Sequence, residues 1–258
     1  MSKINTAFKN GKAFITFLTG GDPSIECSKE FILAMERSGA DIIEIGIPFS
    51  DPIAEGVVIQ NANIRALENG ATLEKIFSLV EAVRKESQVP LVFLSYLNPI
   101  LHYGYNAFFS RCKNIGLDGI IIPDLPFEEH LEISAEADSN GIDLISLIAP
   151  TSEDRIKKIA ENGKGFLYIV SSLGVTGMRS EIKTDLKSII DTIREYRPNI
   201  PCAVGFGINT PDQAAAIAKV ADGVIVGSAI VKIIEAHGEK AAPFIVDYVK
   251  KMKAAISS

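Results

Sequence analysis

The chain reads IIEIGIPFSDPIAEG at residues 42–56. Its apolar start, residues 42–47, predicts a buried strand that contains one acid, Glu44. Desolvating a lone carboxylate is costly, so Glu44 needs either a buried partner or a chemical task. The loop that follows carries two more acids, Asp51 and Glu55. An acid inside a strand, next to an acidic loop at the carboxyl end of that strand, is how parallel α/β enzymes build their active sites.

A local pattern recurs along the chain and extends this prediction to further strands. A helical stretch ends in Gly, a short polar step follows, and a run rich in Ile, Val and Leu begins, as at residues 38–47. Gly suits the left-handed residue that closes a helix, and continuous apolar runs are typical of parallel strands covered on both faces. Runs of this kind occupy residues 13–19, 41–47, 90–96, 119–124, 143–149, 165–171, 201–207 and 223–228.

Eight strands alternating with helices in 258 residues match the size and order of a closed (β/α)8 barrel, the TIM-barrel architecture. An open doubly wound sheet is the alternative. We expect an extra helix before the first strand and a short helix, residues 229–236, after the eighth. No linker or composition break divides the chain, so residues 1–258 are expected to form a single domain.

Two helix starts have recognisable caps. Asp22 stands before Pro23, which predicts a helix capped by Asp22 with Pro at its first position. Thr210 is followed by Pro211 and then by Gln213, which predicts a second helix start with a capping box.

Composition excludes several classes of protein. The chain is 47% apolar and 22% charged, which favours a sizeable core over disorder. A net charge of −6 without a basic block argues against a nucleic-acid partner. No apolar segment is long enough to predict a membrane span, and the first residues lack the apolar run of a signal peptide. We therefore expect a cytoplasmic protein.

Cysteine and histidine spacing predicts no metal ion. The cysteines at 27, 112 and 202 are scattered, and none pairs at metal or redox spacing. The three histidines also stand alone, without the spacing of metal ligands.

The carboxyl ends of barrel strands face the active site, so polar and small residues there are candidates for binding. Tyr96 and Asp124 end the third and fourth predicted strands. The seventh ends in a Gly-Phe-Gly sequence that contains Gly207, and the eighth leads through Gly227 and Ser228 into a helix. Glycines let the backbone approach a ligand, and a helix N-terminus offers free N–H groups, so these two ends predict a phosphate site.

Each candidate also has a purely structural interpretation. Glycines after a strand can simply turn the chain. Glu44 can form a buried ion pair, and Asp22 and Asp124 can be held by backbone N–H groups. Tyr168 is predicted to face the barrel interior, where it can be either core filler or site wall.

Taken together, these motifs resemble the tryptophan synthase alpha subunit family, over about residues 5 to 253. The resemblance rests on four segments that occur in order: Phe49-Ser50-Asp51-Pro52 after Glu44, Gly174-Val175-Thr176-Gly177, Gly205-Phe206-Gly207-Ile208 and Gly227-Ser228-Ala229-Ile230-Val231. It implies a TIM barrel that cleaves indole-3-glycerol phosphate to indole and glyceraldehyde 3-phosphate. It also implies a complex with a pyridoxal-phosphate beta subunit, which receives the indole, and no cofactor in this chain.

The resemblance assigns roles to individual residues. Glu44 matches the catalytic acid and base, and Glu55 matches a second acid that hydrogen-bonds the indole N–H. Among the expected substrate-binding residues, Phe17 and Tyr168 match cavity residues around the indole, and Thr176 matches a loop residue that helps to close the site. Tyr96 and Asp124 are added as substrate-binding residues because they stand at strand ends. The phosphate cradle is expected to be Gly177, Gly207, Gly227 and Ser228. Because indole leaves at the strand ends, the beta subunit is expected to contact Asp51, Pro52 and Asn98.

The chain departs from the family at three places. The second acid is usually Asp, and the longer Glu55 extends its carboxylate outward by roughly 1–1.5 Å. Val57 stands where Pro is usual, which leaves the loop less constrained. Residues 171–173 lack an Arg that is common there. Two other functions therefore stay open: a weakly active or non-catalytic subunit that activates its beta partner, and another phosphate-binding barrel isomerase.

Overall fold

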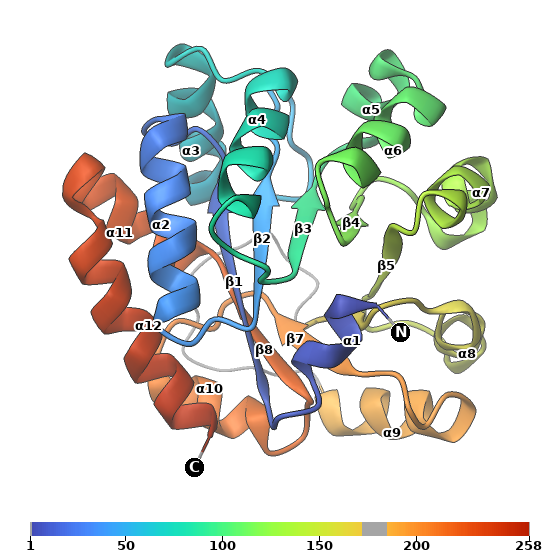
Figure 1. The fold of residues 1–258 in the computed structure, drawn as a ribbon. Helices are drawn as coiled ribbons and strands as arrows, with labels where there is room; N and C mark the ends of the chain where they lie inside the picture. Colours follow the sequence, from blue (N-terminus) through green and yellow to red (C-terminus); the bar gives the residue numbers. More distant parts are fainter. Residues whose placement is uncertain (1, 172–184, 258) are drawn as a thin grey trace.

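The computed structural model describes residues 2–171 and 185–257. At its centre, eight parallel strands pair in sequence order, and β1 also pairs with β8, so the sheet closes into a barrel (Figure 1). The predicted closed barrel is confirmed and the open sheet is excluded. The strands are β1 Ala13–Thr19, β2 Ile42–Gly46, β3 Leu91–Leu94, β4 Gly119–Ile121, β5 Asp143–Ile148, β6 Leu167–Val170, β7 Cys202–Gly205 and β8 Gly223–Val226.

Every predicted strand is present, but most are shorter than their apolar runs. The run at 119–124, for example, forms a strand only as far as Ile121. Pro123 has no N–H to donate to a neighbouring strand, so the chain leaves the sheet before it.

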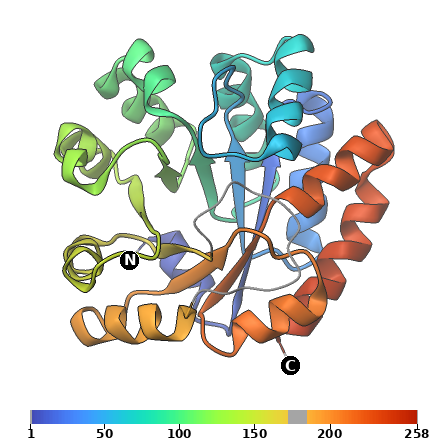
Figure 2. The ribbon, with the colours of Figure 1, turned by 180° about the vertical axis from the view of Figure 1, so that it is seen from behind.

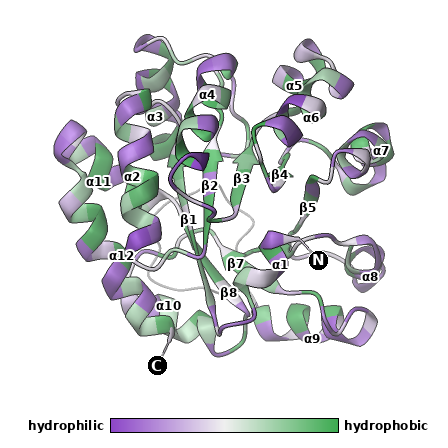
Figure 3. Ribbon diagram, viewed as in Figure 1, coloured by the Kyte–Doolittle hydropathy of each residue, from purple (hydrophilic) through white to green (hydrophobic). Residues whose placement is uncertain are grey.

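Helices surround the barrel on all sides (Figures 1 and 2). Their apolar faces pack on the strands, and hydrophilic residues lie on the outside of the ring (Figure 3). The α-helices are α1 Lys3–Ala7, α2 Ile25–Arg37, α3 Val57–Glu68, α4 Leu73–Arg84, α5 Leu97–Tyr103, α6 Tyr105–Asn114, α7 Leu131–Ser139, α8 Glu153–Asn162, α9 Leu186–Tyr196, α10 Pro211–Ala218, α11 Ser228–His237 and α12 Ala242–Ile256. There are also two short 3-10 helices: η1 Phe127–Glu129 lies before α7, and η2 Gly238–Lys240 lies between α11 and α12. The expected helices before the first strand and after the eighth are α1 and α11. Within the described ranges, no helix is long and apolar enough to span a membrane.

One of the two predicted helix starts is wrong. Helix α2 begins at Ile25, and its cap is Ser24, whose side chain accepts a hydrogen bond from the backbone N–H of Cys27. Asp22 is instead buried and pairs with Arg65 of α3 through two contacts of 2.8 and 3.0 Å. The second start is confirmed, because Thr210 and Gln213 form a capping box at α10.

The barrel interior is filled by alternate residues of the strands. Ile15, Ile42, Val92, Ile121 and other inward-facing residues form one apolar cluster with the ring of Tyr168. Glycines make room for the larger rings. A Cβ on Gly205 would lie 2.3 Å from the Tyr168 hydroxyl, and one on Gly46 would lie 2.7 Å from Phe17, so neither position has space for a side chain.

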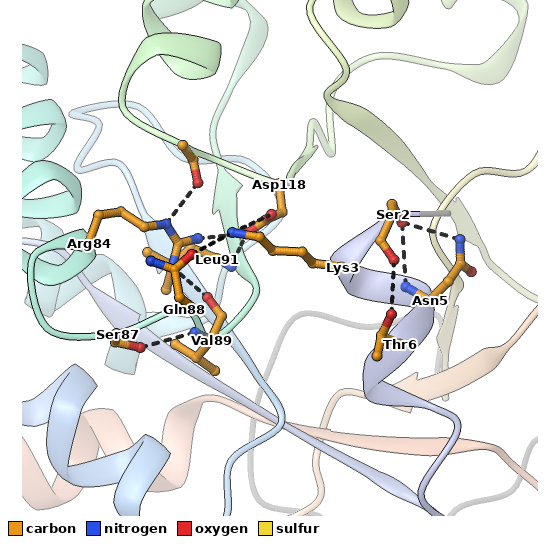
Figure 4. Close-up of polar contacts among 11 residues, drawn as sticks. Ser2, Lys3, Asn5, Thr6, Arg84, Ser87, Gln88, Val89, Leu91 and Asp118 are labelled. Carbon is orange, nitrogen blue, oxygen red and sulfur yellow. Dashed lines mark hydrogen bonds and ion pairs between the residues drawn. The ribbon is translucent and has the colours of Figure 1, made fainter.

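Helix α1 lies over one end of the barrel rather than in the outer ring (Figure 1). Its Ile4 is fully buried in the barrel cluster, beside the start of β4 at Gly119. Lys3 of the same helix donates to Gln88 at 2.9 Å and lies 3.9 Å from Asp118. Figure 4 shows how these contacts fix α1 to the amino-terminal end of the barrel.

Asp118 also organises the chain around it. Its Oδ2 accepts from Arg84 at 2.6 Å and from the backbone N–H of Leu91 at 2.9 Å, at the first residue of β3 (Figure 4). The amino-terminal end is therefore closed by apolar packing and by ion pairs, which leaves the opposite end for the site.

Candidate active site

A cavity of about 450 Å³ opens at the carboxyl ends of the strands. Residues of all eight strands or of the loops directly after them line it, and most of these residues are apolar. Three charged side chains are among the described lining residues, and they are Glu44, Glu55 and Lys232.

Glu44 lies in the wall of this cavity on β2. Its backbone pairs with Phe17 of β1 and Val92 of β3, and the side chain is 1% exposed. Its Oε1 has no hydrogen-bond partner among the described residues. Burial raises the pKa of Glu44 from 4.5 to about 8, because the apolar surroundings disfavour its charged form. A carboxyl with this pKa is able to give and to take a proton near neutral pH.

Glu55 lies on the loop between β2 and α3 and is 7% exposed. Its Oε2 accepts a hydrogen bond from Asn63 of α3 at 2.9 Å. Burial raises the pKa of Glu55 to about 7, and the bond from Asn63 opposes that rise. The two acids predicted from the sequence therefore line one cavity, with different surroundings.

Three aromatic rings form part of the cavity wall: Phe17, Tyr168 and Phe206. Tyr168 and Phe206 meet edge to face with their ring centroids 5.8 Å apart. Burial, and then the nearby charge of Glu44, raise the pKa of Tyr168. The hydroxyl therefore stays protonated, and the rings offer a flat apolar space beside the two acids.

The loop after β7 is unusual in its backbone. Phe206 has φ 73° and Gly207 has φ 82°, so two consecutive residues adopt the left-handed conformation. A bulky residue rarely adopts this conformation, and such strain is concentrated at functional sites. The loop is held by the Ser171 hydroxyl, which donates to the Phe206 carbonyl at 2.5 Å, and by Tyr248, which donates to the Asn209 carbonyl at 2.9 Å.

Helix α11 begins next to this loop. Gly227 and Ser228 line the cavity together with Gly207. No side chain of the described residues caps the first turn of α11, so its N–H groups are open to an acceptor from the cavity. The positive end of a ten-residue helix next to a glycine-rich loop is an arrangement that favours a negatively charged group.

Tyr96 and Asp124 are placed differently from the residues above, since the cavity wall formed by the described residues does not include them. The Tyr96 hydroxyl accepts from the backbone N–H of Ala54 at 2.9 Å, and its ring lies 5.2 Å from that of Phe49. Asp124 accepts from the N–H of Leu97 at the start of α5, at 2.9 Å. Tyr96 thus supports the loop that carries Glu55, and Asp124 holds a helix start. Their contact with substrate stays a prediction.

Comparison with known proteins explains why these features occur together. The family model described as tryptophan synthase alpha chain matches residues 4–257. The tryptophan synthase alpha chain of Lacticaseibacillus casei is 47% identical over 258 residues, which cover 100% of this chain and 97% of that one. The chain belongs to the tryptophan synthase alpha chain family.

Solved structures agree in fold. A structure of Mycobacterium tuberculosis tryptophan synthase superposes with a TM-score of 0.90 at 32% identity, covering 100% of this chain and 99% of that one. A structure of the tryptophan synthase α2β2 complex from Pyrococcus furiosus superposes with a TM-score of 0.86 at 37% identity, covering 94% and 98%.

Not all residues that the family resemblance singles out can be placed. Thr176 and Gly177 lie outside the described residues. Asp51 and Asn98 are exposed and Pro52 is partly exposed, on the loop before Glu55 and at the start of α5. The hydrogen bond between Ala54 and Tyr96 joins these two segments, so the predicted partner residues belong to neighbouring parts of one surface.

Sequence reasoning missed one residue that lines the cavity and one that supports a lining residue from behind. Asn63, buried on α3, is the hydrogen-bond donor to Glu55. Lys232 lines the cavity from α11, one helical turn after Ser228. The spacing of four residues between Ser228 and Lys232 is a signal that the sequence does contain, because residues four apart share a helix face. Among the described residues, no group of three or more His, Cys, Asp or Glu is arranged to hold a metal ion.

Proposed function

We propose that this chain is the alpha subunit of tryptophan synthase and cleaves indole-3-glycerol phosphate to indole and glyceraldehyde 3-phosphate. The observation that carries this proposal is Glu44, a buried carboxyl in a mostly apolar cavity, with one oxygen that has no hydrogen-bond partner among the described residues. The start of helix α11 lines the same cavity. The substrate has a matching layout, with a flat apolar ring at one end and a phosphate at the other.

The reaction is a retro-aldol cleavage, and it requires two proton transfers. Indole C3 gains a proton, and the hydroxyl on the adjacent side-chain carbon loses one. The C–C bond then breaks, its electron pair returns to the indole ring, and the hydroxyl carbon becomes the aldehyde of glyceraldehyde 3-phosphate. Glu44 is the proposed group for these transfers, since its pKa of about 8 allows both protonation states near neutral pH.

Glu55 is the proposed partner of the indole N–H. Protonation at C3 places positive charge on the indole nitrogen, and an ionised carboxylate beside it stabilises that charge. The hydrogen bond from Asn63 supports this role, because it favours the ionised form of Glu55. Phe17 and Tyr168 are proposed to enclose the ring.

The phosphate is proposed to bind the backbone N–H groups at Gly207, Gly227 and Ser228, with Gly177 and Thr176 as further family positions. Gly227→Asp tests this site, because its carboxylate would repel the dianion, so KM should rise sharply. Gly227→Ala is the matched control, since its Cβ would contact Phe17 at 3.3 Å without adding charge. An equal KM in the two variants would remove the phosphate from this position.

An assay of indole release, with this chain alone and with a beta subunit, tests the activity. Glu44→Gln keeps the shape of the side chain but cannot transfer a proton, so release should fall by about 1,000-fold. Binding of the phosphate substrate should be nearly unchanged in that variant. Wild-type release by Glu44→Gln would contradict the mechanism. No release by the wild type, together with stimulation of the beta subunit, would favour the activator function, and neither activity would favour a different barrel enzyme.

The beta subunit is proposed to bind at the carboxyl end of the barrel, on Asp51, Pro52 and Asn98, as part of an α2β2 complex. Pyridoxal phosphate would then belong to the beta subunit, and this chain would act through its own carboxyls. Asp51→Ala should weaken activation by the beta subunit far more than basal release, because Asp51 is exposed and lies outside the described cavity wall. Equal losses in both assays would place Asp51 in the catalytic site instead. A cytoplasmic location suits an enzyme of amino-acid biosynthesis.

A further inference from the structure

We infer that Lys232 binds the substrate phosphate and makes the cavity selective for a dianion. This inference rests on the proposed function, because it concerns the phosphate end of the same cavity. Lys232 is the basic side chain among the described residues that line this cavity.

The position of Lys232 on α11 brings it to the anion site. The helix begins at Ser228, and Lys232 follows four residues later, so both side chains lie on one face of the helix. Residues at this spacing are separated by about 5–6 Å between Cβ atoms. A lysine side chain spans that distance, so its ammonium group reaches a phosphate held at the first turn.

The contacts of Lys232 leave its charge available. No hydrogen bond or ion pair with another described residue engages its Nζ, although the neighbouring acid Glu235 is paired with Arg65 at 3.1 Å. The other charged groups that face the cavity in the described structure are Glu44 and Glu55. Lys232 shares the cavity wall with two carboxyls and pairs with neither, so within the described structure its ammonium group is available to a ligand.

The charge balance of the site also calls for a cation. A phosphate monoester carries close to two negative charges at pH 7, since its second pKa is about 6. The N-terminus of α11 offers the equivalent of roughly half a positive charge. An ammonium group supplies a full one. Glu44 lines the same cavity, and its buried Oε1, which has no hydrogen-bond partner among the described residues, independently indicates a ligand there.

The test compares two ligands that occupy opposite ends of the cavity. Glycerol 3-phosphate probes the phosphate end, and indole probes the apolar end without any charge. A charge-assisted hydrogen bond contributes about 1.5–3 kcal/mol, so Lys232→Met should raise the Kd for glycerol 3-phosphate by about 10- to 100-fold. The Kd for indole should stay within about twofold. Lys232→Gln is measured in parallel as a polar replacement without charge. It should also raise the Kd for glycerol 3-phosphate and leave the Kd for indole nearly unchanged.

Two controls separate charge from structure. Lys232→Arg keeps the positive charge and should bind glycerol 3-phosphate nearly as the wild type does. Lys250→Met removes an exposed lysine from α12 and should leave the Kd of both ligands unchanged. The salt dependence of glycerol 3-phosphate binding should also become shallower in Lys232→Met than in Lys250→Met.

The outcomes are distinct from those of the activity assay. Unchanged binding of glycerol 3-phosphate by Lys232→Met and Lys232→Gln would overturn the inference, and so would an equal loss of indole and glycerol 3-phosphate. If the wild type binds glycerol 3-phosphate through Lys232 but releases no indole, the inference stands and the proposed reaction fails.

Discussion

Asn63 donates a hydrogen bond from its Nδ2 to Oε2 of Glu55 at 2.9 Å. The contact joins the second turn of α3 to the loop residue that stands two positions before the helix begins. Both side chains are buried, at 3% and 7% exposure. A single amide therefore fixes where this carboxylate lies and favours its ionised form.

Asn63→Ala should reduce the rate of indole release by about 10-fold, because the charge-assisted bond that orients Glu55 is lost. The pKa of Glu55 should rise further, since burial would act on it without opposition from Asn63. This change should appear in the pH dependence of kcat/KM as a shift of the acidic limb to higher pH, because Glu55 acts in its ionised form. Asn61→Ala, at an exposed position of the same helix, is the control. Identical pH profiles for the two variants would show that Asn63 does not act through Glu55.

Glu55→Asp is expected to lower kcat by about 10- to 100-fold, since a misplacement of about 1 Å can cost this much in rate. The shorter side chain would draw its carboxylate away from Asn63, with which Glu55 makes a well-formed bond. Steady-state indole release measures the effect. A faster Glu55→Asp enzyme would mean that the longer acid is a handicap and that the contact with Asn63 is not the productive one.

Glu44 should make the folded protein less stable as pH rises. In the unfolded chain it loses its proton near its ordinary pKa of 4.5, whereas burial raises the folded pKa to about 8. Between these values the folded state binds more protons than the unfolded state, so the free energy of unfolding falls with increasing pH. Glu44→Gln removes this contribution, and its stability relative to wild type should increase by up to about 4 kcal/mol between pH 5 and pH 8.

Urea unfolding at several pH values measures this difference. Glu239→Gln, which changes an exposed carboxyl in η2, is the matched control. Its free energy of unfolding should depend on pH as that of the wild type does. A constant difference between Glu44→Gln and wild type across this range would mean that Glu44 is not held protonated in the fold.

Tyr96→Phe should destabilise the protein by about 1 kcal/mol and slow indole release. The partly buried N–H of Ala54 would lose its acceptor, and the loop that carries Glu55 would be less well positioned. Binding of glycerol 3-phosphate should be unaffected, since Gly207 and Ser228 lie elsewhere in the cavity. Tyr103→Phe, which removes an exposed hydroxyl contact to Glu74, is the control for thermal unfolding and kinetics. A raised KM with an unchanged kcat in Tyr96→Phe would instead support direct contact with substrate.

Ile4→Ala should cost about 2–4 kcal/mol of stability, because Ile4 is fully buried in the barrel cluster. The kcat for indole release should change little at temperatures where the variant is folded, since α1 lies at the opposite end from Glu44 and Glu55. Denaturant unfolding and indole release, measured on the same preparation, test both statements. A loss of activity that exceeds the loss of folded protein would contradict this separation.

The sequence predicts the barrel well because parallel strands are buried on both faces and leave continuous apolar runs. It predicts strand ends less well, as at Ile121, because apolar composition alone does not show where pairing stops. The capping role of Asp22 was wrong for a different reason. Its partner Arg65 is 43 residues away, and Ser24 takes the cap that Asp22 leaves.

The acids of the candidate site stand out in the sequence because charge is rare in apolar runs. Asn63, the partner of Glu55, does not, because it is one of several polar residues on a helix and nothing in the sequence marks it as the buried one. For Tyr96, the sequence predicts the position but not the contact. Its place at a strand end predicts a site residue, but only the structure shows its hydroxyl on the backbone of Ala54.

Helix α1 leaves the cavity open at only one end of the barrel in the part of the chain that the structure describes. Ile4 and Phe166 fill the barrel at the end where α1 lies, and Gln88 and Asp118 tie that helix down. A molecule that reaches Glu44 therefore enters and leaves by the same route, at the carboxyl ends of the strands. The loop that carries Glu55 forms part of the cavity wall at this end, so a protein bound on that loop would affect the entry of substrate and the exit of product together.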